Sequence, residues 1–187
     1  KLDSATKVSL ENLDAGIGNI AVKGRVAANL SGSRPAVDVA LSTDTINLDE
    51  LMPKEDKAAK APPADKGDGR VFPNDPLPLD GLKAADAKVK FTAKTIIMQG
   101  MKIADVDLGV NLSGGKLKIN PLAAGFGGGK INGDIALNAS GSTAGLKVAL
   151  SVKDINYGTI LTERGITDIA EGKLNADINV SGSGGSV

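Results

Sequence analysis

Residues 131–152 read INGDIALNASGSTAGLKVALSV, and this stretch decides the fold class. Apolar residues occupy alternate positions on both sides of Gly141, with Ile135 before it and Val148 after it. A period of two places such side chains on one face of a β-strand, and the small and polar residues around Gly141 indicate a turn. The stretch therefore predicts a hairpin with one apolar and one polar face.

The same alternation recurs in six further segments, which gives eight predicted strands. The other face of these segments carries residues such as Lys88 and Asp177, the pattern of an antiparallel sheet with one face in water. The apolar positions are Ile20, Val22, Val26; Val37, Val39, Leu41; Val89, Phe91; Val106, Leu108, Val110; Leu117, Ile119; Ile131, Ile135, Leu137; Leu146, Val148, Leu150, Val152; and Leu174, Ile178, Val180.

Only two helices are predicted, Asn47–Met52 before Pro53 and Tyr157–Arg164 before Gly165. Two short helices are too small to cover eight strands. We therefore predict an all-β fold, in which a long, twisted, mainly antiparallel sheet curls into an open groove and carries two short helices.

An internal repeat supports this architecture. An offset of 109 places Gly24 on Gly133 and, without a gap, Ile46 and Asn47 on Ile155 and Asn156, just before each predicted helix. A tetrapeptide of Asn, an apolar residue, Ser and Gly also recurs, and we interpret each copy as a hairpin turn that ends a strand. The four copies begin at Asn29, Asn111, Asn138 and Asn179.

The repeat divides the chain into three parts. Residues 1–53 form a groove segment that ends in a short helix, and residues 79–187 form a second groove segment that repeats the first. Between them, residues 54–78 are rich in Pro and charge, which is typical of a linker or an insertion. A boundary between two independent domains is the alternative.

The composition excludes several classes of function. The chain has no His and no Cys, so His-based triads, Cys–His dyads and His-based metal sites are absent. Gly125–Gly133 lacks the Gly and the Ser or Thr that a phosphate loop requires. Asp105 and Asp107 share a strand face that we expect to be solvent-exposed. We expect no enzyme activity, cofactor or bound metal.

Charge and aromatic content bear on the partner. The 22 basic and 22 acidic residues cancel, and no basic stretch is interleaved with aromatics, so nucleic acid is not an expected partner. Aromatics are only 2% of the chain, and small residues such as Gly24 and Gly133 lie on the apolar face. The face, roughly 650 Å² in area, is either closed by a second sheet or left as a trough for an apolar ligand. The small residues favour the trough.

Two groups of residues resemble the AsmA family of Gram-negative envelope proteins. The likeness covers about residues 75–187, and it reaches residues 1–53 through the internal repeat. The motifs that carry it are Asp75-Pro76-Leu77-Pro78-Leu79, Lys116–Leu122, Gly127–Gly133, and Gly172–Ile178 with Ser181–Gly184.

The resemblance implies a periplasmic repeating β-groove, like that of chorein-type bridge proteins, in a protein anchored to the inner membrane outside this chain. It implies a non-enzymatic function in which the groove binds or conducts phospholipid, or another acyl-chain lipid, in support of outer-membrane biogenesis and lipid homeostasis. The alternatives are a structural β-repeat scaffold, an adhesin-like stalk, or an assembly factor for outer-membrane proteins. The apolar positions given above are the expected lipid-groove residues.

Overall fold

The computed structural model describes residues 6–18, 20–51, 79–141, 143–166 and 171–184. Within them it contains nine strands and three short helices. The strands are β1 (Lys7–Ile17), β2 (Ile20–Asn29), β3 (Ala36–Asn47), β4 (Asp86–Met98), β5 (Met101–Ser113), β6 (Lys116–Phe126), β7 (Gly129–Asn138), β8 (Ala144–Asn156) and β9 (Lys173–Gly184).

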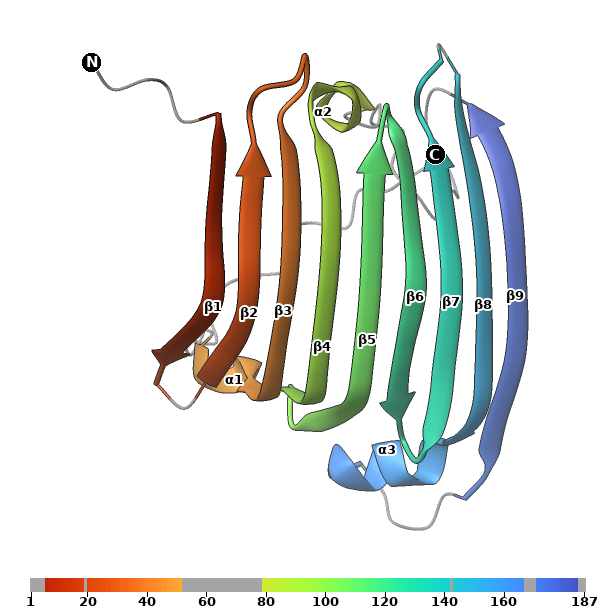
Figure 1. The fold of residues 1–187 in the computed structure, drawn as a ribbon. Coiled ribbons are helices and arrows are strands. Elements are labelled where there is room, and N and C mark those ends of the chain that lie inside the picture. Colours follow the sequence, from red (N-terminus) through yellow and green to blue (C-terminus); the bar gives the residue numbers. More distant parts are fainter. Residues whose placement is uncertain (1–5, 19, 52–78, 142, 167–170, 185–187) are drawn as a thin grey trace, which may run out of the picture.

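All nine strands form one sheet, in the order in which they occur in the sequence (Figure 1). Seven of the eight strand pairings are antiparallel, and only β3 and β4 run parallel. β1 and β9 are the two edges, so the sheet is open. The predicted all-β, mainly antiparallel open sheet is confirmed.

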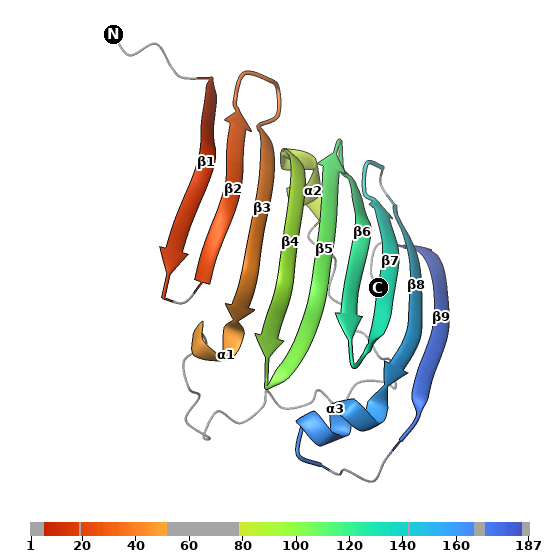
Figure 2. The same cartoon turned by 60° about the horizontal axis from the view of Figure 1, so that its bottom comes forward.

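The helices lie at the ends of the strands (Figures 1 and 2). α1 (Leu48–Leu51) and α3 (Tyr157–Glu163) follow β3 and β8 at one end, and α2 (Leu79–Ala84) precedes β4 at the other. We call these the α3 end and the α2 end. Two helices were predicted, and α2 is the addition. The signal for α2 is short, and it adjoins the Pro-rich segment whose composition masked it.

Both predicted helices begin after an equivalent asparagine. The Asn156 side chain caps α3 by accepting a hydrogen bond from the Thr159 backbone N–H, 3.3 Å away. The Asn47 side chain accepts one from the Asp49 N–H at 3.1 Å. Asn and Asp favour such local bonds over continuing a strand, which explains why both strands stop at these positions.

The sheet has nine strands where eight were predicted, because the alternation of apolar residues did not predict β1. Its pairing with β2 shifts register between Leu10 and Leu13, where Asn12 has a φ of 55°. Such a bulge inserts an extra residue and reverses which positions face which side. The apolar residues of β1 therefore change phase halfway along the strand, and no single period of two describes them.

The turn prediction is correct at three of the four tetrapeptides. Asn29 ends β2 and Asn138 ends β7, and each side chain accepts a hydrogen bond from a backbone N–H two residues later. The tetrapeptide that begins at Asn111 also ends a strand, since β5 stops at Ser113 before the turn to β6. The prediction is wrong at Asn179, because β9 continues past that tetrapeptide and is still paired with β8.

The sheet is a single layer with almost no enclosed core. Among the described residues, the buried hydrophobic ones are Ala93, Ala139, Ala144 and Ile155, and no large side chain is fully buried. A sandwich would bury its inner faces completely. The described residues form no second sheet, so none of them closes the apolar face.

Candidate functional site

The strand register decides which side chains share a face, because residues paired across two strands point to the same side of a sheet. Following these partners from β1 to β9 gives three unbroken rows of nine residues each. Every member of the three rows is Val, Leu, Ile, Phe, Ala or Gly. We call this side of the sheet the apolar face and the other side the polar face.

The first row, nearest the α2 end, consists of Val8, Ala28, Val37, Ala87, Leu112, Leu117, Leu137, Leu146 and Gly182. The second consists of Leu10, Val26, Val39, Val89, Val110, Ile119, Ile135, Val148 and Val180. The third consists of Leu13, Gly24, Leu41, Phe91, Leu108, Leu122, Gly133, Leu150 and Ile178.

A fourth row lies toward the α3 end in two parts, because the pairing of β5 with β6 shifts register there. One part crosses β1 to β5 and the other crosses β6 to β9. Its members are Ala15, Val22, Thr43, Ala93 and Val106, and then Ala124, Ile131, Val152 and Ala176.

The structure brings all 23 predicted groove residues onto this apolar face. Twenty-one of them are members of the four rows. Ile20 lies two residues from Val22 on β2, and Leu174 pairs with Ile155 at the α3 end. Their shared placement is a fact of the register, whereas their role toward a lipid stays a prediction.

Sequence reasoning missed the β1 members of the rows and Leu122 on β6. Both omissions follow from bulges, since β6 shifts register against β7 between Ile119 and Leu122. The offset of 109 contains the missing signal. Extended backward without a gap, it places Leu10 on Ile119 and Leu13 on Leu122, so that one bulge falls on the other.

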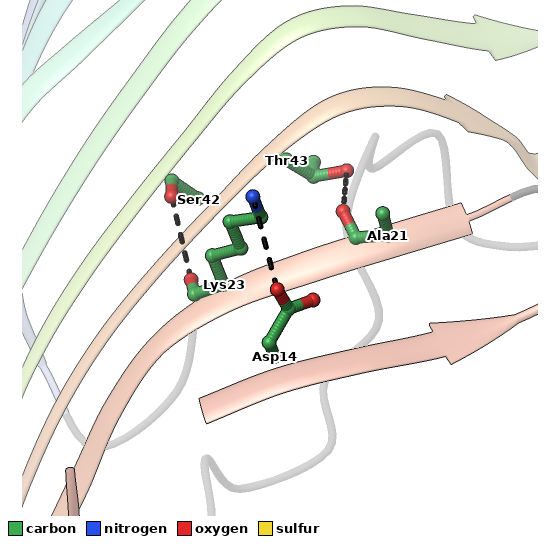
Figure 3. A network of polar contacts seen from close by, with 5 residues as sticks. All are labelled: Asp14, Ala21, Lys23, Ser42 and Thr43. Carbon is green, nitrogen blue, oxygen red and sulfur yellow. Dashed lines mark hydrogen bonds and ion pairs between the residues drawn. The ribbon is translucent and has the colours of Figure 1, made fainter. Parts of the chain in front are cut away.

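Thr43 is the one residue of the four rows with a polar side chain. It is buried, and its hydroxyl donates a hydrogen bond to the Ala21 carbonyl at 2.8 Å (Figure 3). A buried hydroxyl without a partner would be costly. Because Thr43 is satisfied by the neighbouring strand's backbone, it leaves the apolar face without an exposed polar group at this position.

Figure 3 also shows how the polar face differs. Lys23 and Asp14 approach to 3.8 Å there, and both side chains are 68% exposed. The Ser42 hydroxyl donates to the Lys23 carbonyl at 3.3 Å. These groups remain in water, and ion pairs of this kind contribute little to stability. The polar face is therefore the side of the sheet that contacts water.

The two carboxylates of the predicted solvent-facing pair are not equally exposed. The pairing of β5 with β6 shifts register between Ala104 and Asp107, and Asp105 between them has a φ of 48°. Asp105 is exposed, whereas Asp107 is half-buried, and its Oδ1 atom is buried and accepts no hydrogen bond from the described residues. The register places Asp107 on the polar face, as alternation predicted, but alternation did not predict the shielding of one of its oxygens.

Two features are absent from the described residues. No three or more Asp or Glu side chains gather in a way that would hold a metal ion. No helix in the described part of the chain combines the length and the hydropathy required to cross a membrane.

An open, repeated sheet with one continuous apolar face defines the chain as a repeating β-sheet protein. Comparison with family models matches the AsmA family over residues 1–187, so the chain belongs to that family. It is similar to "AsmA family protein YhjG" of Escherichia coli (strain K12), with 23% identity over 185 residues. That alignment covers 91% of this chain and 27% of the relative. No solved structure matches.

Membership of this family supports an envelope-associated protein. The predicted resemblance, based on residues 75–187 and the internal repeat, is confirmed over the whole chain. The chain spans about a quarter of the length of the curated relative it matches, 27%.

Proposed function

We propose that the chain is a non-enzymatic, lipid-binding segment of a periplasmic protein that is anchored to the inner membrane. Phospholipid, or another acyl-chain lipid, would lie with its tails on the apolar face. Because each row runs across the strands, the lipid could move along the rows from strand to strand. Its cellular function would be to support outer-membrane biogenesis and lipid homeostasis.

One observation carries the proposal: three rows of apolar residues cross all nine strands without a polar interruption. Eight interstrand spacings of about 4.8 Å, and four rows about 6.7 Å apart, give a face of roughly 38 by 20 Å. Its area, roughly 760 Å², exceeds the largest apolar patch of a typical soluble monomer. A face of this size supports an apolar partner.

Continuity of the rows matters for the energetics of transfer. Transfer of a tail of about 15 methylenes into water costs about 12 kcal/mol of free energy, at about 0.8 kcal/mol per methylene. A gap in the apolar path would impose part of that cost as a barrier. The second row has no Gly and no Ala, so it offers side-chain contact on every strand.

The test places one carboxylate on the apolar face. Val148→Asp lies in the second row, between Ile135 and Val180. Because no second layer among the described residues covers this row, the carboxylate stays hydrated, and we expect melting to change little while bound phospholipid falls several-fold. Bound lipid is measured by mass spectrometry of the purified chain after detergent-free washing.

The matched control is Ala136→Asp on the polar face. Ala136 pairs with Lys118 on one side and Lys147 on the other, so the new carboxylate meets two cations. It serves better than Ala149→Asp, whose cross-strand neighbour is Asp134. The control is expected to retain lipid at the wild-type level.

The alternative is a structural scaffold that associates through its edges. Exposed apolar residues on the two edge strands, each of which has a strand partner on one side only, favour it. They are Val8, Leu10, Leu174, Ile178 and Val180, each 44–57% exposed. If the wild-type chain retains no lipid, or if Val148→Asp unfolds it as a core substitution would, the scaffold replaces the lipid-binding segment.

A further inference from the structure

The two ends of the sheet differ in charge although the whole chain is neutral. The third apolar row divides the described residues into an α2 half and an α3 half. Among residues whose side chains the structure describes, the α2 half carries nine basic ones, Lys7, Arg25, Arg34, Lys83, Lys88, Lys90, Lys116, Lys118 and Lys147, against four acidic ones, Glu11, Asp38, Asp86 and Asp134. The α3 half carries seven basic and ten acidic residues. The sheet is therefore positive toward the α2 end and negative toward the α3 end.

The positive charge concentrates around one turn. The turn between β5 and β6 consists of Gly114 and Gly115, and Lys116 follows it directly. A Cβ placed on Gly114 would lie 3.7 Å from an Arg34 nitrogen, and one on Gly115 would lie 3.2 Å from Lys83 Cγ. Three cations from three segments therefore surround this glycine turn.

One carboxylate offsets one of the three cations. Asp86 accepts hydrogen bonds from the Gly114 N–H at 2.9 Å and from Arg34 at 3.4 Å. Lys83 donates to the Gly141 carbonyl at 3.4 Å, which adds no negative charge. Lys116 makes no ion pair with any residue that the structure describes. The charges of Lys83 and Lys116 remain available to an anion.

The turn also adjoins the apolar face. Leu112 and Leu117, which flank the turn, pair with each other in the first apolar row. A hollow of about 490 Å³ opens at the same end, and its lining includes Ala87 and Leu112 of the first row and Ser113 beside the turn, but none of the three cations. Lys116 alternates with Leu117, so its side chain leaves β6 on the polar side, at the rim of the sheet. A ligand with its tail on the apolar rows and its charged group at this rim would contact both.

We infer that the α2 end holds the phosphate-bearing headgroup of the lipid, at the turn surrounded by Arg34, Lys83 and Lys116. The inference rests on the proposed lipid binding and adds an orientation to it. Tails lie on the apolar rows, headgroups lie along the α2 end, and the acidic α3 end repels them. Exposed lysines attract anionic headgroups, and salt screens this attraction.

The experiment compares two lipids that have the same tails. The chain is loaded with dioleoyl-phosphatidylglycerol or with dioleoylglycerol, which has no phosphate, and bound lipid is measured by mass spectrometry at low and high salt. In the double variant Lys83→Gln, Lys116→Gln, we expect retention of phosphatidylglycerol to fall at least about fivefold, the factor that one lysine contributes near an anionic lipid surface. Retention of dioleoylglycerol stays at the wild-type level.

The matched control removes the same charge from the α3 half. Lys130 and Lys153 are cross-strand partners there, and the double variant Lys130→Gln, Lys153→Gln is expected to retain both lipids. An equal loss in both double variants would overturn the location, and no loss in Lys83→Gln, Lys116→Gln would overturn the inference while lipid binding stands. A wild-type chain that retains neither lipid would instead refute the proposed function.

The last arm tests free phosphate as the source of the anion. Inorganic phosphate is titrated into the wild-type chain while the backbone amide signals of Gly114 and Gly115 are followed by NMR. The inference expects weak binding by phosphate alone, because the tails are absent. Binding as tight as that of phosphatidylglycerol would assign the turn to free phosphate and overturn the lipid assignment.

Discussion

Two regions of the sheet are built on one plan. β1, β2 and β3 pair with each other in the same registers as β6, β7 and β8, with every partner displaced by 109 residues. The bulge recurs as well, between Leu10 and Leu13 in the first region and between Ile119 and Leu122 in the second. A short helix then follows each region. We call them the first and the second unit.

The units differ in what comes next. After α1 the chain reaches β4, which runs parallel to β3, whereas after α3 it reaches β9, which runs antiparallel to β8. Residues 52–85 separate α1 from β4, but only residues 164–172 separate α3 from β9. A parallel neighbour requires the chain to return along the whole strand, about 40 Å for a strand of this length, and the shorter connection cannot span that distance.

The comparison teaches that register and strand direction have different sources. Register follows from side-chain identity within each unit, because apolar positions and bulges must match across strands. The direction of the next strand follows from the length of the connection. The apolar face is continuous across both the parallel and the antiparallel pairings, since either kind of partner strand presents its alternate side chains to the same side of the sheet.

The largest expected effect separates two equivalent glycines, Gly24 and Gly133. A Cβ on Gly24 would collide with the Ala40 carbonyl, whereas one on Gly133 would meet Leu150 Cδ2 at 2.6 Å and Leu122 Cδ2 at 3.0 Å. Backbone cannot move aside, but the ends of leucine side chains can rotate. We expect Gly24→Ala to lower the free energy of unfolding by about 3 kcal/mol and Gly133→Ala by about 1 kcal/mol.

Urea unfolding of the two glycine variants measures this difference. Gly145→Ala in β8 is the control, because nothing lies within 4 Å of its added Cβ. Its free energy of unfolding is expected to stay at or slightly above the wild-type value. Equal losses in Gly24→Ala and Gly133→Ala would mean that the two units pack alike at this position, against the contacts described.

A moderate and equal effect is expected at the two hairpin turns. Asn29 accepts hydrogen bonds from the N–H and the hydroxyl of Ser31, at 3.1 and 2.6 Å. Asn138 accepts the same pair from Ser140, at 3.1 and 2.7 Å. We expect Asn29→Ala and Asn138→Ala each to cost about 1 kcal/mol, the usual contribution of such bonds.

The double variant and a third asparagine sharpen this test. The two turns share no partner, so the losses measured by urea unfolding should add in the double variant. Asn111 carries the same tetrapeptide but lies inside β5 and makes no side-chain hydrogen bond with the described residues. A loss at Asn111→Ala as large as at the turns would show that the motif, and not the turn geometry, carries the stability.

Most of the fold is predictable from the sequence because one face is apolar and alternation records it. The eight predicted strands and both predicted helices occur where the pattern places them. β1 was missed because a bulge reverses its phase at Asn12. The parallel pairing of β3 with β4 was also not predicted. Alternation is identical in parallel and antiparallel strands, so it contains no information on direction.

The candidate site was predictable only in part. The 23 apolar positions follow from alternation, and their common face follows from the register. The cations around Gly114 and Gly115 were not predictable, because they come from segments up to 82 residues apart, from Arg34 to Lys116. Only the parallel pairing of β3 with β4 brings the turn before β3 close to α2. A periodicity within one strand cannot record such a meeting.

The smallest expected effect concerns an ion pair between β3 of the first unit and β4. Lys94 of β4 lies 2.6 Å from the Oδ1 atom of Asp44 on β3, across the parallel pairing, and the equivalent of Asp44 in the second unit is Lys153. The hydrogen bond from Lys94, and then its charge, lower the pKa of Asp44 below 3.8. The same contact raises the pKa of Lys94 above 10.5.

These shifts fix the sign of the pH dependence. A lowered carboxyl pKa stabilises the fold above 3.8, and this contribution is lost as the pH falls through the lowered value. A raised lysine pKa stabilises below 10.5, and that contribution is lost as the pH rises through the raised value. Both side chains are about four-fifths exposed, 77% and 80%, so water and salt screen the pair. We expect Asp44→Asn to shift the urea midpoint slightly at neutral pH, less in high salt, and not at all in acid below the lowered pKa. A shift that persists in acid would assign the effect of Asp44→Asn to packing between β3 and β4, and the ion pair would then contribute nothing to the parallel pairing.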